Sequence, residues 1–134
     1  MLYKVNKSQY LLAGNPNTSY LQLEEYSRSP EPAIRARVAE NPSTPLRILF
    51  KLINDQDADV RLSLAWNPSA SGLLLLELAE DSDVDVRYAI AENSHAPLVV
   101  LEKLSKDENP YVVHRALKTL SNEKPVYITQ LQAA

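Results

Sequence analysis

Carboxylates and arginines recur at close spacing along the chain, and these residue types could do chemistry together. Asp57 and Asp59 precede Arg61, and the same trio recurs 26 residues later. Paired acids beside a guanidinium could act in general acid–base catalysis or could hold a phosphate group. The recurrence argues against such a site, because catalysis needs one copy whereas the stacking of repeats needs many. We therefore interpret the acids as helix caps and the arginines as bridges between neighbouring repeats.

Other residues with catalytic or metal-binding chemistry are scattered. The two histidines, His95 and His114, are not spaced with carboxylates as in H-E-x-x-H zinc sites. The chain has no cysteine, and it contains neither a Gly-rich phosphate loop nor a Ser-His-Asp arrangement. The sequence therefore predicts a protein that is not an enzyme, with no catalytic residues, no cofactor and no metal site.

Length and composition describe an ordinary globular chain. Its 134 residues are 45% hydrophobic and 23% charged, with a formal net charge of −3. We expect one domain, and the acidic balance argues against nucleic acid as a partner. No segment approaches the length of a membrane span or of a signal-peptide core, so a cytoplasmic, non-membrane protein is expected.

A 26-residue repeat organises these residues. It is clearest in four asparagines at this spacing, of which the first three precede proline: Asn15, Asn41, Asn67 and Asn93. Arginines keep the same spacing at three positions, and Val113 stands where a fourth is expected: Arg35, Arg61 and Arg87. We interpret these asparagines and arginines as a structural ladder that joins each repeat to the next.

Each repeat reads as two short helices. Thr44 is expected to cap the first helix, with Pro45 at its first helical position. Asp57 is expected to cap a second helix that starts near residue 58 and stops at Asn67, because Pro68 cannot continue it. The inner face of this second helix is predicted to consist of three apolar residues: Val60, Leu64 and Ala65.

A unit this small cannot bury its own apolar face, so the repeats must stack. The predicted fold is all-α, an α-solenoid of about four two-helix repeats with capping ends. We place a single domain at 1–134, with an N-terminal cap or half-repeat at 1–14 and a C-terminal cap or tail at 119–134. The repeats lie between them: 15–40, 41–66, 67–92 and 93–118.

The repeated pattern resembles a known family. Stretches such as "VAENPSTPLRILFKLINDQDADVR" and "LAWNPSASGLLLLELAEDSDVDVR" are similar to the leucine-rich repeat variant family of HEAT-like repeats. The resemblance covers about residues 8–117. It implies the right-handed superhelix of paired helices, in which the second helix is α or 3₁₀. A cysteine-ligated iron–sulfur cluster that accompanies some family members does not transfer to a chain without cysteine.

Positions that differ between repeats are those that stacking does not dictate. Trp66 is the clearest, because the same position holds Glu40, Glu92 and Lys118 in other repeats. We predict that the second helices present a protein-binding face with an aromatic and apolar strip between charged residues. It contains eight residues: Arg37, Leu62, Trp66, Tyr88, Glu92, Tyr111, His114 and Arg115. The alternative is that Trp66 only fills a groove against the next repeat.

The sequence leaves other partners open. Phe50 and Leu76 share a position on the first helices and would support self-association if that position is exposed. The function that we favour is a non-enzymatic protein-interaction module. The alternatives are a nucleic-acid-binding HEAT-like solenoid, using Arg37, Arg115 and Lys118, and an accessory subunit of an enzyme or of a cofactor-assembly system.

Overall fold

The protein is all-α in the part of the chain described by a computed structural model, residues 5–123. This part contains nine α-helices and no β-strand, and none of its helices is long and apolar enough to cross a membrane. The chain divides into two compact units, Met1–Ser71 and Gly72–Ala134, which we call the first and the second unit. Each unit is described by itself below. The predicted C-terminal cap or tail lies outside the described residues from position 124 onward.

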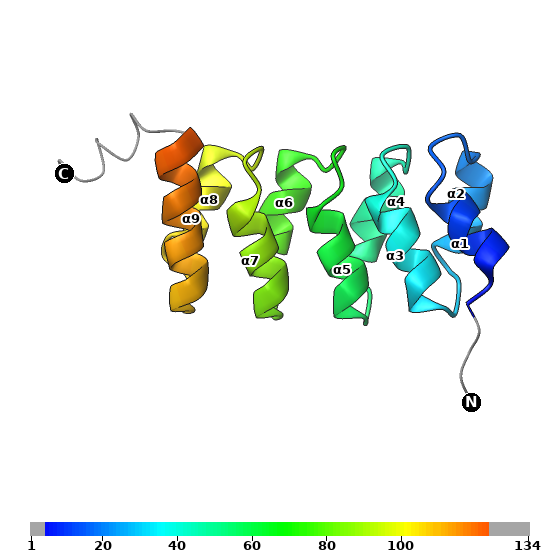
Figure 1. Ribbon diagram of the computed structural model, residues 1–134, viewed down its shortest axis with the longest axis horizontal. Coiled ribbons are helices and arrows are strands. Elements are labelled where there is room, and N and C mark those ends of the chain that lie inside the picture. The colour runs from blue at the N-terminus through cyan, green and yellow to red at the C-terminus, as the bar shows by residue number, and fades with distance from the viewer. Residues whose placement is uncertain (1–4, 124–134) are drawn as a thin grey trace. The chain divides into compact units, whose positions relative to one another are not determined.

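The first unit contains five helices (Figure 1): α1 (Lys7–Ala13), α2 (Tyr20–Tyr26), α3 (Pro32–Glu40), α4 (Leu46–Leu52) and α5 (Ala58–Ala65). Helix α3 packs against both α1 and α5, α2 packs against α1 and α3, and α4 packs against α5. Leucine, isoleucine and valine side chains fill the interior between them, including Leu23, Ile34, Leu49 and Leu64. Each helix is too short to be stable alone, so this shared core stabilises all five.

The second unit contains the remaining helices: α6 (Gly72–Leu78), α7 (Val84–Glu92), α8 (Leu98–Leu104) and α9 (Pro110–Glu123). Helix α9 packs against α7 and α8, and α6 packs against the same two helices. Figure 1 shows α7 and α9 side by side, as α3 and α5 are in the first unit. Below, α2, α4, α6 and α8 are called the first helices and α3, α5, α7 and α9 the second helices. All of them are α-helical rather than 3₁₀.

The predicted starts of the second helices are confirmed at three of the four equivalent positions, whereas Glu31, the residue before α3, forms no side-chain cap hydrogen bond. Asp57 caps α5 and accepts a hydrogen bond from the Asp59 N–H at 2.8 Å. Asp83 caps α7 in the same way, and Asn109 accepts from the Tyr111 N–H at 2.9 Å. The inner face of α5 is confirmed as well, since Val60, Leu64 and Ala65 are all fully buried.

The predicted start of the first helix is wrong at Thr44. Helix α4 begins at Leu46, and Pro45 takes the cap position without a side-chain hydrogen bond. The Thr44 hydroxyl instead donates to the Val38 carbonyl at 2.7 Å. It therefore satisfies a carbonyl at the end of the preceding helix rather than an amide at the start of the next one.

The ends of the second helices depend on asparagine more than on proline. Helix α7 stops at Glu92 although Ser94, not proline, follows Asn93. The Asn93 side chain accepts the His95 N–H at 2.9 Å, which is an Asx turn. The Asn67 and Asn41 side chains accept the N–H two residues on in the same manner. Our attribution of the helix end to Pro68 was therefore incomplete, because the asparagine turn alone ends a helix.

Candidate functional site

Two asparagines of the first unit, Asn41 and Asn67, bind the segment that lies about one repeat earlier. The buried Asn41 amide donates to the carbonyls of Ala13 and Asn15, both at 2.9 Å. The buried Asn67 amide repeats this geometry one step later, donating to Ala39 at 2.8 Å and to Asn41 at 3.0 Å. These side chains use both donors and one acceptor inside the protein, so they contribute to packing and leave no group for a ligand.

A threonine takes the same position in the second unit. Thr119 lies 26 residues after Asn93, and its hydroxyl donates to the Ala91 carbonyl at 2.7 Å. The separation of 28 residues equals that between Asn41 and Ala13. Because no asparagine turn forms at Thr119, α9 continues to Glu123, and it is the longest helix of the described part. Position 119 is the next position of the 26-residue spacing after Asn93, and this spacing is the signal in the sequence that points to Thr119.

The arginines form a second set of contacts. Arg35 donates to the Ser29 carbonyl at 2.8 Å and binds both oxygens of Asp55, with Nε–Oδ2 at 2.7 Å and Nη2–Oδ1 at 3.0 Å. Arg61 repeats the first contact by donating to the Asp55 carbonyl at 2.6 Å. We assigned carboxylates to these arginines from the sequence but did not identify Asp55 as the partner of Arg35.

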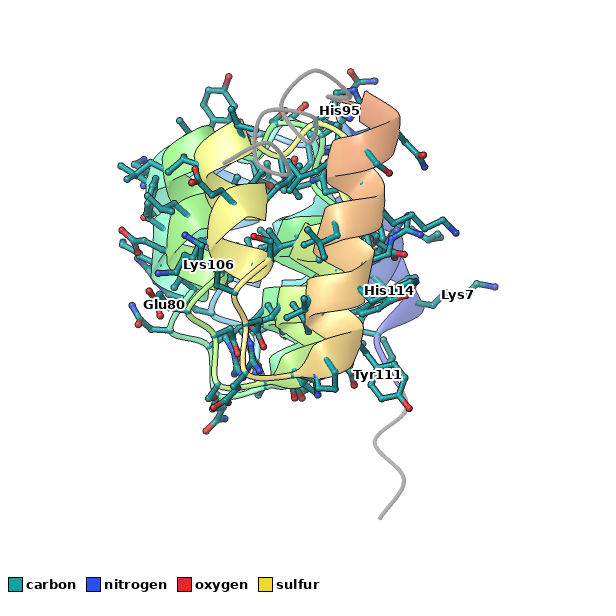
Figure 2. All side chains as sticks on the ribbon, turned by 90° about the vertical axis from the view of Figure 1, so that its left-hand side faces the viewer. Lys7, Glu80, His95, Lys106, Tyr111 and His114 are labelled. Atoms are coloured by element: carbon teal, nitrogen blue, oxygen red, sulfur yellow. The ribbon has the colours of Figure 1, made fainter. Side chains whose placement is uncertain are left out.

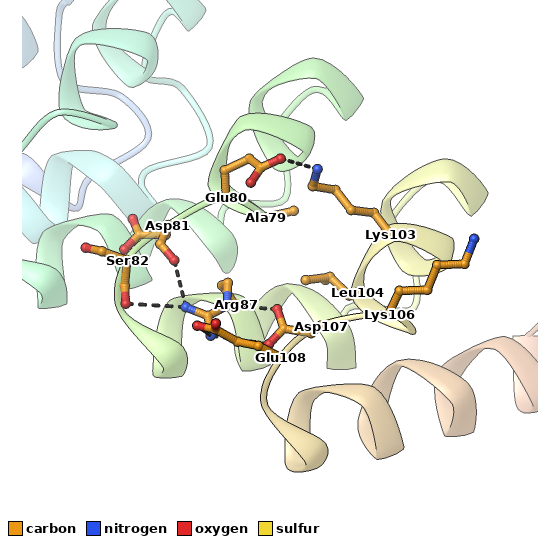
Figure 3. A pocket seen from close by; sticks show the side chains of 10 residues that line it. All are labelled: Ala79, Glu80, Asp81, Ser82, Arg87, Lys103, Leu104, Lys106, Asp107 and Glu108. Carbon is orange, nitrogen blue, oxygen red and sulfur yellow. Dashed lines mark hydrogen bonds and ion pairs between the residues drawn. The ribbon is translucent and has the colours of Figure 1, made fainter.

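Arg87 has the equivalent contacts in the second unit (Figure 3). It binds Asp107 through Nε at 2.8 Å and Nη2 at 3.2 Å, and donates to the Asp81 and Ser82 carbonyls. These residues line an open cleft of about 690 Å³. Arg87 and Asp107, which line the cleft, are paired with one another, so these two side chains act in the structural ladder.

The electrostatics of Asp55 and Asp107 fit a structural role. Burial raises the pKa of each carboxyl group, but hydrogen bonds from the paired arginine and from a backbone N–H outweigh this effect. The net result is a pKa below the ordinary range for both. A carboxylate held ionised in this way is a poor proton donor or acceptor near neutral pH. The geometry thus favours the ladder over acid–base catalysis.

The outward residues of the first unit include a large exposed aromatic ring. Trp66 follows the last residue of α5, and 52% of its surface is exposed. Leu62 lies one turn earlier on α5 and is half-buried. Nothing in the packing of the core requires tryptophan here, because Glu40 and Glu92 take the equivalent position at the ends of α3 and α7.

Arg37 is already engaged within the first unit. Its guanidinium forms an ion pair with Glu40 and lies over the Tyr10 ring, 4.9 Å from the ring centre. Gly14 makes room for it, since a Cβ atom there would overlap the guanidinium. Sequence reasoning missed Tyr10 and Gly14 because their contact with Arg37 depends on side-chain direction. Arg37 is therefore held by contacts within the first unit.

The outward residues of the second unit lie on α7 and α9. Tyr88 and Tyr111 are exposed, Tyr111 to 76% of its surface. Tyr111 and His114 project from α9 on the side away from Glu80 and Lys106 (Figure 2). Arg115 pairs with Glu92 at 3.8 Å, so this surface combines two exposed aromatic rings with an ion pair.

The remaining predicted residues lie elsewhere. Phe50 on α4 and Leu76 on α6 are both half-buried. His95 is exposed in the turn before α8. Among residues 5–123, no group of three or more histidine or acidic side chains could hold a metal ion.

Comparison with known proteins adds no assignment. No family model, no curated protein and no solved structure matches the chain.

Proposed function

We propose that the chain is a non-enzymatic protein-interaction module built as a right-handed α-solenoid. In this proposal it is one domain with about four 26-residue repeats, related to the leucine-rich repeat variant family. The partner is a protein segment that binds the outward surface of the second helices. Eight residues predicted from the sequence contact this segment: Arg37, Leu62, Trp66, Tyr88, Glu92, Tyr111, His114 and Arg115.

The repeated hydrogen bonds support the architecture. Asparagine or threonine side chains reach back 28 residues at three places in the chain, and arginines reach forward 20 residues at two. Contacts at constant separation are what a stack of equal units requires. The bond of Thr119 extends the pattern to the last described helix.

Trp66 is the observation that carries the interaction hypothesis. It exposes half of a large aromatic surface at a position where other repeats carry charged residues. Tryptophan and tyrosine are the residue types most enriched in binding hot spots, and Tyr88 and Tyr111 are exposed as well. The short helices are fixed in place by buried side-chain hydrogen bonds. Binding a partner to these aromatic rings would therefore cost little conformational entropy.

The test is capture of partners from source cells by the wild type and by Trp66→Glu, which restores the residue of neighbouring repeats. We expect the variant to fold normally and to bind its partner about thirtyfold more weakly, the effect of losing one hot-spot residue. Tyr20→Glu is a matched control, since Tyr20 is an exposed aromatic residue on α2.

Three outcomes would contradict the proposal. Equal capture by wild type and Trp66→Glu would show that this surface is not the binding face. Unfolding of Trp66→Glu would make the tryptophan a packing residue. Salt-sensitive retention of the wild type on immobilised DNA or RNA would favour the nucleic-acid alternative instead.

A further inference from the structure

The first helices of the first unit expose a second, different surface. We define the α2–α4 face by Leu21 on α2, by Phe50 on α4 and by three cations around them: Arg28, Arg47 and Lys51. Leu21 exposes 79% of its surface and Phe50 is half-buried. An aliphatic side chain this exposed contributes nothing to the core of its own unit.

The α2–α4 face carries an excess of positive charge. Oε1 of Glu24 lies 2.9 Å from Arg47 Nη1, 3.4 Å from Arg28 Nη2 and 3.9 Å from Lys51 Nζ. The hydrogen bond from Arg47, together with these charges, lowers the pKa of Glu24. Glu25 on α2 is a second, exposed carboxylate, so the face holds three cations against two carboxylates, and the side chains of the three cations are each more than half exposed.

The first helices of the second unit expose a matching apolar surface with the opposite charge. We define the α6–α8 face by Leu73, Val99, Glu77 and Glu102. Leu73 and Val99 expose 61% and 56% of their surfaces. They stand 52 and 78 residues after Leu21, so all three occupy one register position of the 26-residue repeat. Glu77 and Glu102 form no ion pair among the described residues, whereas the nearby Lys103 is paired with Glu80. With the exposed Lys106 included, this side holds three carboxylates against two cations, so its net charge is opposite to that of the α2–α4 face.

We propose that the α2–α4 face of one copy of the protein binds the α6–α8 face of a second copy. The contact would cover the aliphatic side chains of both faces, which stacking leaves exposed. It would also set Arg47 and Lys51 of one copy against Glu77 and Glu102 of the other. A second copy satisfies both requirements without another molecule, because each chain carries one face of each kind.

This contact is independent of the proposed partner surface. In the second unit, Glu80 and Lys106, which follow α6 and α8, point away from Tyr111 and His114 (Figure 2). Self-association through the first helices would therefore leave the second-helix surface of that unit open to its partner.

The test is sedimentation of the full chain over a range of concentrations, with two charge-reversed variants. One variant, Arg47→Glu with Lys51→Glu, makes both faces acidic, and the other, Glu77→Lys with Glu102→Lys, makes both faces basic. We expect the wild type to associate reversibly, and more weakly at high salt. Each variant alone should self-associate at least about tenfold more weakly, whereas an equimolar mixture of the two should associate again.

A control variant distinguishes an effect of the charges on these two faces from an effect of the net charge of the chain. Asp59→Lys with Asp85→Lys makes the same change of charge as Glu77→Lys with Glu102→Lys, but at exposed residues of α5 and α7, and should associate like the wild type. Replacement of Leu73 and Val99 by glutamine should weaken association without altering charge.

A wild type that stays monomeric at every concentration would overturn the proposal. So would a mixture of reversed variants no heavier than its components. Trp66→Glu should still self-associate, so this proposal can fail or hold apart from the proposed function.

Discussion

Replacement of Asn67 by alanine tests the role of the buried asparagines. Asn67 donates to the carbonyls of Ala39 and Asn41 and accepts the N–H of Ser69 at 2.7 Å. Alanine can make none of these three bonds. All three partners belong to the first unit, so the effect should be confined to the unfolding of that unit.

The size of the effect follows from what each partner loses. The buried Ala39 carbonyl loses its donor, and an unsatisfied buried carbonyl costs about 1–3 kcal/mol. The Asn41 carbonyl keeps the Thr44 N–H at 3.0 Å, and the Ser69 N–H can turn to water, so each of these losses costs less. We expect Asn67→Ala to lower the free energy of unfolding by about 3 kcal/mol in total.

The assay is urea unfolding of the full chain followed by circular dichroism. The midpoint should fall while the slope with urea is unchanged, because the surface exposed on unfolding is the same. Asn15→Ala is the matched control, since Asn15 is exposed and its side chain accepts the Asn17 N–H in the same kind of turn. A loss below about 1 kcal/mol for Asn67→Ala, or one equal to that of Asn15→Ala, would refute the assignment.

Two further predictions concern acid and the asparagine turn. Because folding lowers the pKa of Asp55 and Asp107, their contribution to stability is present above the unfolded value near pH 4. It is lost as pH falls through the lower folded value, so the urea midpoint should drop between about pH 5 and pH 2, and less steeply in Asp55→Asn. Ser94→Pro should stabilise the second unit by about 0.4–1 kcal/mol, because Asn93 is already extended and proline follows the equivalent Asn67. A lower melting temperature for Ser94→Pro would contradict this explanation.

Sequence periodicity was sufficient to predict the helical class, the second-helix caps and the inner face of α5. These features depend on local backbone chemistry and on which side of a helix is apolar, and both leave a mark at fixed spacing. Thr44 was misassigned because a hydroxyl can bond to the carbonyls before it as well as to the amides after it. The sequence contained no signal that distinguishes these two directions.

The contacts of long side chains were harder to predict. Asp55 and Asp107 occupy the same position in different repeats, and this was evident from the sequence. The ion pair that each forms with an arginine 20 residues earlier was not. Arg37 was predicted on the binding face, but nothing in the sequence indicated that its guanidinium lies against Tyr10 and Glu40 in the space left by Gly14. A flexible side chain with several rotamers can reach many neighbours, and periodicity does not select among them.

The direction of the asparagine bonds has a consequence for synthesis of the chain. Each donor of this kind lies 26 or 28 residues after the carbonyl that it binds. Its acceptors therefore leave the ribosome before it does. The bonds of Asn41 and Asn67 need no residue made after Ser69, so the first unit can complete them while the second is still being translated. As the nascent chain grows, each new asparagine donates to carbonyls at or just after the end of a helix that was synthesised earlier.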